Sequence, residues 1–205
     1  SNLGGILRDL GKLKEAEFFT RKAIEINPDY AMAYTNLGTI LKDLGKFKEA
    51  EFSFRKAIEI KPNIAEAHSN LGNLLREFGK LKEAEFSTRK AIKINPDYAL
   101  AYLNLGSILR DLGKLREAEF STRKSIEINP GLAEAHSNLG TILRDLRKLK
   151  EAEFSTRKAI EIKPDYALAH SNLGSILKNL GKLKEAEFCF CKAIKIQPYL
   201  ANAYF

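Results

Sequence analysis

The residues of this chain whose chemistry stands out are asparagines that recur every 34 positions. An asparagine amide both donates and accepts hydrogen bonds, so a regular row of amides suits the backbone of an extended peptide. A second use is open, in which each amide joins its own stretch of chain to the next. The row comprises Asn2, Asn36, Asn70, Asn104, Asn138 and Asn172.

Small polar and basic residues keep the same interval. Most asparagines are followed by a small polar residue three positions later, and all are followed by a basic residue six positions later. The cations are interpreted either as solvated pairs with the acids that follow them or as holders of acidic groups on a ligand. The candidate site residues are Asn36, Asn70, Asn104, Asn138, Asn172, Thr39, Asn73, Ser107, Thr141, Lys42, Arg76, Arg110, Arg144 and Lys178.

The elements that position these residues follow from the same interval, which all six prolines also keep. We number the stretch 31–64 from 1 to 34 and take it as one repeat. Residues 31–44 predict a helix whose buried arc holds Ala33, Leu37, Ile40, Leu41 and Leu44. Gly45 then ends this helix. The face opposite the core carries positions 2, 5, 6, 9, 12 and 13, which include the asparagines.

The second half of the repeat predicts another helix over residues 47–60. Its buried residues are expected to be Phe47, Ala50, Phe54, Ala57 and Ile58. It ends at Lys61, since the residue before a proline avoids the helical region.

Glycine in the middle of the first helix predicts close packing. Gly38 costs roughly 1 kcal/mol there relative to alanine, and every repeat has glycine at this position. Close approach of the second helix is the physical reason we expect. A pair of helices cannot bury both faces alone, so each pair must stack on its neighbours.

The pattern resembles the tetratricopeptide repeat over the whole chain. Repeat 31–64 matches the family at Tyr34, Leu37, Gly38, Ala50, Phe54, Ala57 and Pro62. The resemblance implies an all-α fold, a right-handed superhelical solenoid of antiparallel helix pairs, with the asparagine face lining the concave groove. It implies a single solenoid over 1–205: a partial repeat at 1–30, full repeats at 31–64, 65–98, 99–132, 133–166 and 167–200, and the start of a further helix at 201–205.

The function implied is a protein-interaction scaffold that binds an extended peptide. The finer pattern is similar to arrays that precede O-linked glycosyltransferase domains and to bacterial relatives, so the alternative is a substrate-selecting arm of a larger enzyme. The ends fall inside helices, which also predicts head-to-tail self-association. Nucleic acid is disfavoured as a partner because acidic side chains on the candidate face offset the positive charge of its Lys and Arg residues.

Other activities are not indicated. Three histidines lie 34 or 68 residues apart, and Cys189 and Cys191 face different sides of their helix, so no metal or cofactor is expected. No motif of a catalytic site occurs, and the chain is interpreted as non-catalytic. No apolar run is long enough for a membrane span. Two cysteines form no disulfide framework, which predicts a cytoplasmic location. The net charge of +8 weakly favours an acidic partner.

Three departures from the family pattern lead to further expectations. Arg147 replaces the turn glycine and costs about 1 kcal/mol if its φ is positive. Position 24 is threonine in Thr20, Thr88, Thr122 and Thr156. Phenylalanine occupies position 22 throughout, at Phe18, Phe52, Phe86, Phe120, Phe154 and Phe188. We expect it to compensate for the threonine by packing on the adjacent repeat; the alternative is an exposed aromatic row that marks an interface.

Overall fold

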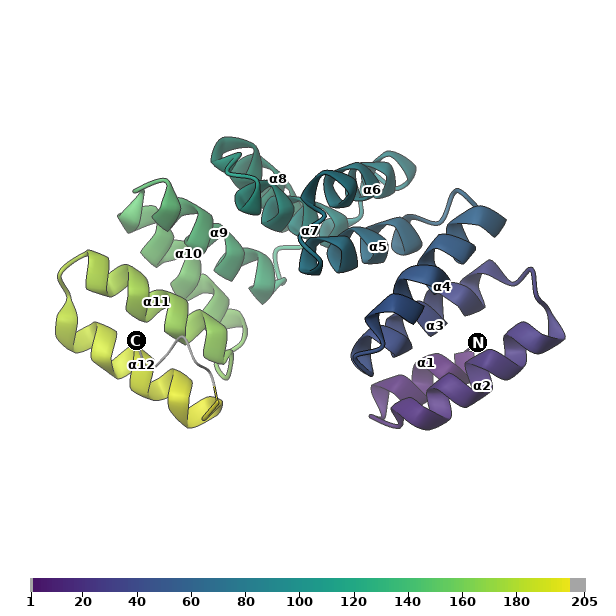
Figure 1. Ribbon diagram of the computed structural model, residues 1–205. Coiled ribbons are helices and arrows are strands. Elements are labelled where there is room, and N and C mark those ends of the chain that lie inside the picture. The colour runs from purple at the N-terminus through teal and green to yellow at the C-terminus, as the bar shows by residue number, and fades with distance from the viewer. Residues whose placement is uncertain (1, 200–205) are drawn as a thin grey trace. The chain divides into compact units, whose positions relative to one another are not determined.

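The computed structural model describes residues 2–199, in which every regular element is an α-helix (Figure 1). Ser1, the side chain of Asn2 and residues 200–205 lie outside this description. The helix start at 201–205 and the head-to-tail contact built on it therefore stay predictions. The chain divides into two compact units between Asn104 and Leu105.

Two kinds of helix alternate along the described residues. The first kind, which we call helix A, comprises α1 (Asn2–Asp9), α3 (Ala31–Asp43), α5 (Ala65–Glu77), α7 (Ala99–Asp111), α9 (Ala133–Asp145) and α11 (Ala167–Asn179). The second kind, helix B, comprises α2 (Leu13–Ile26), α4 (Phe47–Ile60), α6 (Leu81–Ile94), α8 (Leu115–Ile128), α10 (Leu149–Ile162) and α12 (Leu183–Ile196). Both predicted helices of repeat 31–64 are confirmed, the first one residue shorter than expected.

The turn after helix A follows from its glycine. Gly45 has φ +74°. Its N–H donates to the Lys42 carbonyl at 2.9 Å, and the Lys46 N–H donates to the Leu41 carbonyl at 2.8 Å. These two bonds satisfy the last carbonyls of the helix. Arg147 makes the same turn with φ 63°, so the positive φ suspected from the sequence is confirmed.

The core is shared between successive helix pairs. Leu7 of α1, Ala16 of α2 and Ile40 of α3 form one buried cluster, and Leu44 packs against it. In the second unit, Leu139, Leu143, Ala152 and Ile176 connect α9, α10 and α11 in the same way. Within each unit, helix pairs thus bury their apolar faces against neighbouring pairs, as the sequence predicts.

Close approach at the mid-helix glycine is confirmed. A Cβ added to Gly38 would lie 2.6 Å from the Phe54 ring, closer than atoms pack. At Gly72 an added Cβ would collide with the Thr88 hydroxyl and lie 3.1 Å from the Ala84 carbonyl oxygen. The side chain at position 24 and the helix B backbone therefore make the contact.

Three expected core residues are less buried than predicted, and one of them is the half-buried Leu44. Phe47 is 41% exposed, and its ring meets the Phe78 ring edge to face with centroids 6.3 Å apart. Phe47 is the first residue of α4, at the end of the helix pair, where the neighbouring helix covers only part of it. Ile58 is half-buried and packs at the edge of a small cluster around Ala57 and Ile64.

Candidate functional site

The asparagine amides of helix A lie between successive helix A elements. The side chains of Asn36, Asn70, Asn104, Asn138 and Asn172 are half-buried. The core residue that follows each of them, such as Leu71 after Asn70, is buried and holds the helix in place. The amides therefore have one side against the protein and one side toward solvent.

Each amide nitrogen whose bond is resolved reaches back to a hydroxyl of the preceding repeat. Asn70 Nδ2 donates to Thr39 Oγ at 3.3 Å, and Asn138 Nδ2 donates to Ser107 Oγ at 3.1 Å. Asn104 and Asn172 donate instead to Ser69 and Ser137, each at 3.0 Å. The amide nitrogens thus link neighbouring repeats, which is the structural one of the two uses considered from the sequence.

The amide oxygens face a different environment. Those of Asn70, Asn104, Asn138 and Asn172 accept no hydrogen bond from any residue that the structure describes. Among the buried side-chain N and O atoms of these residues, only His68 Nδ1 lacks a partner. The four oxygens are therefore reachable from solvent and retain their capacity to accept a hydrogen bond.

Hydroxyls on the same helices are partly withdrawn from the surface. The residues at position 5 were expected on the open face, but Thr35, Ser69, Ser137 and Ser171 are buried. This expectation was wrong because the following helix A lies against position 5, as Asn104 does on Ser69 and Asn172 on Ser137. Thr141, a candidate at position 9, is also buried.

The remaining candidates at position 9 stay half-buried, as Thr39, Asn73 and Ser107 show. The Thr39 hydroxyl donates to the Thr35 carbonyl at 3.1 Å, which leaves its lone pairs for Asn70. Thr39 and Ser107 at position 9 therefore orient the amides of Asn70 and Asn138 as well as adding polar groups to the face.

The basic row differs in pairing from repeat to repeat. Arg110 Nε donates to Asp145 at 2.7 Å, and Arg144 contacts the same carboxylate at 3.1 Å. Lys42 and Lys178 form no ion pair with any described residue, whereas Arg76 does have a partner. The face thus holds both neutralised and unneutralised cations.

The histidines and cysteines do not form a site. Nε2 of His68, His136 and His170 lies 3.0, 3.0 and 2.8 Å from the carbonyls of Pro62, Pro130 and Pro164. Each ring therefore holds the turn before its helix. Burial lowers the pKa of His68, which favours the neutral ring.

Two thiols differ in the same region. Cys189 is buried and Cys191 exposed, and both are free. Burial raises the pKa of Cys189, which keeps its thiol protonated. No group of three or more potential metal ligands occurs among residues 2–199. None of the helices within that range is long and apolar enough to cross a bilayer.

The phenylalanine at position 22 is exposed, contrary to the expectation that it packs on the adjacent repeat. The exposed fraction runs from 56% at Phe18 to 73% at Phe154. The threonine at position 24 needs no compensation: Thr88 is buried and its hydroxyl donates to the Ala84 carbonyl at 2.9 Å. The alternative drawn from the sequence, an exposed aromatic row, therefore describes helix B.

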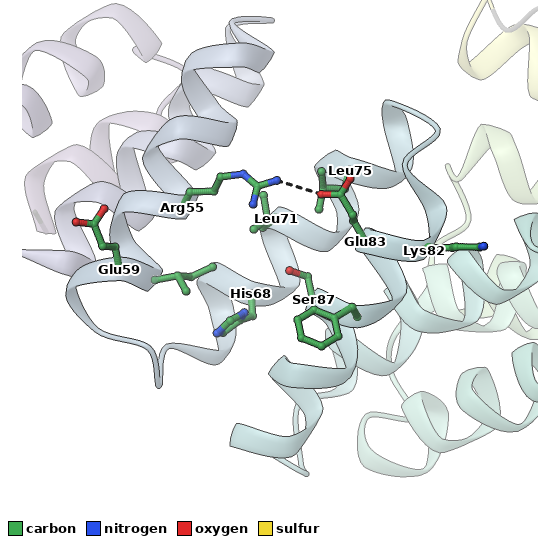
Figure 2. Close-up of a pocket in the computed structure, with 10 residues that line it drawn as sticks. Arg55, Glu59, His68, Leu71, Leu75, Lys82, Glu83 and Ser87 are labelled. Atoms are coloured by element: carbon green, nitrogen blue, oxygen red, sulfur yellow. Dashed lines mark hydrogen bonds and ion pairs between the residues drawn. The ribbon is translucent and has the colours of Figure 1, made fainter.

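Beside this row lie pockets that sequence reasoning missed. One of about 680 Å³ is formed by α4, α5 and α6, and its apolar lining includes Ile58, Leu71 and Phe86. Figure 2 shows Arg55 reaching toward Glu83 at this pocket, with a separation of 3.3 Å. The periodic isoleucine at position 28 and phenylalanine at position 22 were the signal that such a pocket repeats.

Comparisons with known proteins agree with this architecture. Family models described as tetratricopeptide repeat match residues 1–30, 31–64, 65–98, 88–120, 133–166 and 167–199. No curated protein sequence matches the chain.

Solved structures are similar over nearly the whole chain. The crystal structure of YrrB, a TPR protein with an unusual peptide-binding site, is 27% identical with a TM-score of 0.64, covering 90% of this chain and 95% of YrrB. MamA is 25% identical with a TM-score of 0.65, covering 82% of this chain and 92% of MamA. The pilus biogenesis factor PilW shares the fold at 22% identity and a TM-score of 0.87, covering 100% of this chain and 94% of PilW.

The repeat interval, the twelve described helices and these matches converge on one architecture, an all-α helical-repeat solenoid that serves as a protein-interaction scaffold. The chain belongs to the tetratricopeptide repeat family.

Proposed function

We propose that the chain binds an extended peptide on the polar face of helix A, with the asparagine amides receiving the peptide backbone. The observation that supports this most directly is that the nitrogen and the oxygen of each amide have different surroundings. The nitrogen is held by a hydroxyl of the preceding repeat, while the oxygen is solvent-accessible and accepts no bond. The oxygen is therefore oriented in advance, which lowers the entropic cost of binding a backbone N–H.

The two uses of the asparagines are compatible on this proposal. Within one asparagine side chain, the amide nitrogen links two repeats and the amide oxygen would bind the peptide. Proteins related in sequence and fold include YrrB, which has a peptide-binding site, and the proposal extends peptide binding to this chain.

The charges on the same face set a preference among peptides. Lys42 and Lys178 carry no intramolecular ion pair with described residues, so acidic groups on the peptide gain a partner there. Arg110 and Arg144 are already paired with Asp145, so they contribute less to the affinity for an acidic peptide. The ligand is therefore proposed to be an acidic peptide of low sequence specificity, because the repeats are so similar.

The chain itself is proposed to be a cytoplasmic scaffold without catalytic activity. No group of three or more potential metal ligands lies among the described residues, and the two cysteines that set the last repeat apart are free thiols, of which Cys189 is buried. The alternative of a substrate-selecting arm of a larger enzyme is decided by the complete reading frame of its gene.

The test separates the two ends of the amide. A binder selected from a random short-peptide library is titrated against a variant in which Asn70, Asn104, Asn138 and Asn172 are replaced by alanine. Each backbone hydrogen bond contributes about 1 kcal/mol, so a loss of at least about tenfold in affinity is expected even if only two amides engage the peptide.

The matched control keeps the amides and removes their partners, with Thr39→Val, Ser69→Ala, Ser107→Ala and Ser137→Ala. It should lose stability and lose less affinity than the asparagine variant, since the amide oxygens remain but are no longer oriented in advance. Equal affinity of the asparagine variant and the parent chain, with unchanged helical circular dichroism, would rule out the proposed role.

A further inference from the structure

We propose that the helix B side is a second docking surface, for a partner segment that presents large apolar side chains flanked by carboxylates. The surface consists of the exposed phenylalanine at position 22 together with the pockets beside it. It uses none of the helix A residues assigned to peptide binding, so the two proposals stand or fall separately.

The first argument is that the aromatic row is exposed and lies outside the buried core. Phe52 is 67% exposed and Phe86 66% exposed. Both large and small residues are accommodated at position 24, Phe54 in one repeat and Thr88 in the next, while position 22 remains phenylalanine. An exposed aromatic row of this kind marks an interaction surface rather than a core.

The second argument is that the same pocket recurs. Within the first unit, one pocket is lined by residues that include Ile24, Leu37 and Phe52, and the next by Ile58, Leu71 and Phe86. The helix α4 contributes to both. Figure 2 shows the second of these, with His68 and Leu71 of α5 beside Ser87 of α6.

The second unit repeats this arrangement. One pocket there is lined by residues that include Ile126, Leu139 and Phe154, and the next by Ile160, Leu173 and Phe188. Here α10 contributes to both, and the four volumes lie between about 590 and 680 Å³. A partner that places one apolar side chain in each of two adjacent pockets gains from their proximity.

The third argument is the charge at the rim. The acids around the pocket of Figure 2 are neutralised: Glu83 pairs with Arg55 at 3.3 Å, and Glu59 pairs with Lys56 at 2.8 Å. The basic residue at position 18 is exposed in every repeat and has no ion-pair partner among residues 2–199. This row comprises Lys14, Lys48, Lys82, Arg116, Lys150 and Lys184.

The cations that remain unpaired select the occupant. Their flexible side chains line the rims of the pockets, as Lys82 and Lys48 do. Carboxylates of a partner segment would form ion pairs with them. A partner segment with acids next to its apolar side chains satisfies both features. A second copy of this chain would instead bring two rows of like charge together, which opposes association.

The experiment uses the full chain and a synthetic, fluorescently labelled peptide with two leucines, each flanked by glutamates, joined by a glycine-serine linker of varied length. Binding is followed by fluorescence anisotropy. The parent chain should bind this peptide at least tenfold more tightly than peptides with lysine in place of glutamate or serine in place of leucine.

Variants of the chain locate the site. Phe52→Ser with Phe86→Ser, and separately Lys48→Glu with Lys82→Glu, should each weaken binding at least tenfold. Asn70→Ala with Asn104→Ala, on the helix A side, should leave it unchanged. Circular dichroism checks that each variant is folded, which is expected because all four helix B side chains are exposed.

Several outcomes would overturn the proposal. Absence of binding at every linker length would do so, as would equal binding of the lysine-flanked peptide. Loss of binding only in the asparagine variant would place the peptide on helix A instead. Sedimentation that shows a dimer of the parent chain, abolished by the phenylalanine variants, would identify a second copy as the occupant.

Discussion

At the scale of single residues, one pair of positions explains how the two helices of a repeat fit together. Position 8 is glycine because the side chain at position 24 and the carbonyl at position 20 occupy the space of a Cβ. Threonine at position 24 donates its hydroxyl to that same carbonyl, as Thr122 does to Ala118 at 2.9 Å. The buried hydroxyl is thereby satisfied within its own helix.

Some of the asparagine side chains are also fixed by hydrogen bonds to buried groups. Asn104 Nδ2 reaches Ser69, which is buried, so the amide plane is set by the interior of the protein. A side chain fixed in this way loses little entropy when its oxygen accepts a further bond.

The turn residue Arg147 gives a prediction at this scale. The left-handed backbone conformation of Arg147, with φ 63°, costs roughly 1–2 kcal/mol of strain. Glycine would relieve this strain, but its greater loss of backbone entropy on folding costs about 0.4–1 kcal/mol relative to other residues. Arg147→Gly should therefore raise the free energy of unfolding by about 0.5–1 kcal/mol, measured by urea denaturation.

The converse change is its control. Gly113 makes the same turn with φ +75°, so Gly113→Arg should lower the free energy of unfolding by a similar amount. Two variants that change stability in the same direction would contradict the explanation.

At the scale of elements, charged side chains join successive helix B segments. Glu153 of α10 accepts from Arg157 of its own helix at 2.8 Å and from Lys182, just before α12, at 3.0 Å. Burial raises the pKa of Glu153, but hydrogen bonds and charges from Lys182 and Arg157 outweigh it, so the pKa lies below the ordinary value. Glu17 and Glu119 have the same environment.

This lowered pKa makes the stability depend on pH. A carboxyl with a lower pKa in the folded than in the unfolded state stabilises the fold above the ordinary value of 4.5, and this stabilisation is lost as the pH falls through the folded pKa. Glu153→Gln should cost about 1 kcal/mol near neutral pH. The difference from the parent chain should shrink below pH 4.5 in urea denaturation at a series of pH values.

Glu161 supplies the comparison. It pairs only with Lys158 on its own helix, and its side chain is 68% exposed. Glu161→Gln should leave the free energy of unfolding unchanged at every pH. A loss equal to that of Glu153→Gln would show that bridging between helices is not the cause.

At the scale of the whole molecule, each of the two units is built from contacts between neighbouring helices, and the core clusters around Ala16 and Ala152 bury residues at the same repeat positions. Stability in such arrays is approximately a sum over repeats and their interfaces. The repeats are therefore expected to be exchangeable units that contribute nearly equally to the free energy of unfolding.

Removal of one repeat tests this description. Deletion of residues 133–166 joins α8 to α11, which presents the same interface residues as α9: Ala169, Leu173, Ile176 and Leu177 replace Ala135, Leu139, Ile142 and Leu143. The shortened chain should keep its mean residue ellipticity, with a lower midpoint of urea denaturation. Loss of the helical signal would show that the repeats do not fold as interchangeable units.

The sequence by itself determined the repeat, the helices, their ends and the contact at the mid-helix glycine. These features are local: a 34-residue interval, an apolar arc, a glycine with positive φ and a proline leave few alternatives. The glycine at position 8 had to face a neighbouring helix, because a helix in solvent gains nothing from it.

Only the tertiary structure decided which side chains meet the neighbouring repeat. Position 5 is buried and the phenylalanine at position 22 is exposed, both contrary to expectation, and the asparagine nitrogens bond to preceding hydroxyls. The interval is identical for residues that face a neighbour and for residues that face solvent, so it carries no information on this choice. The packing of one helix pair on the next makes that choice, because it covers some positions at the margin of the apolar arc and leaves others open.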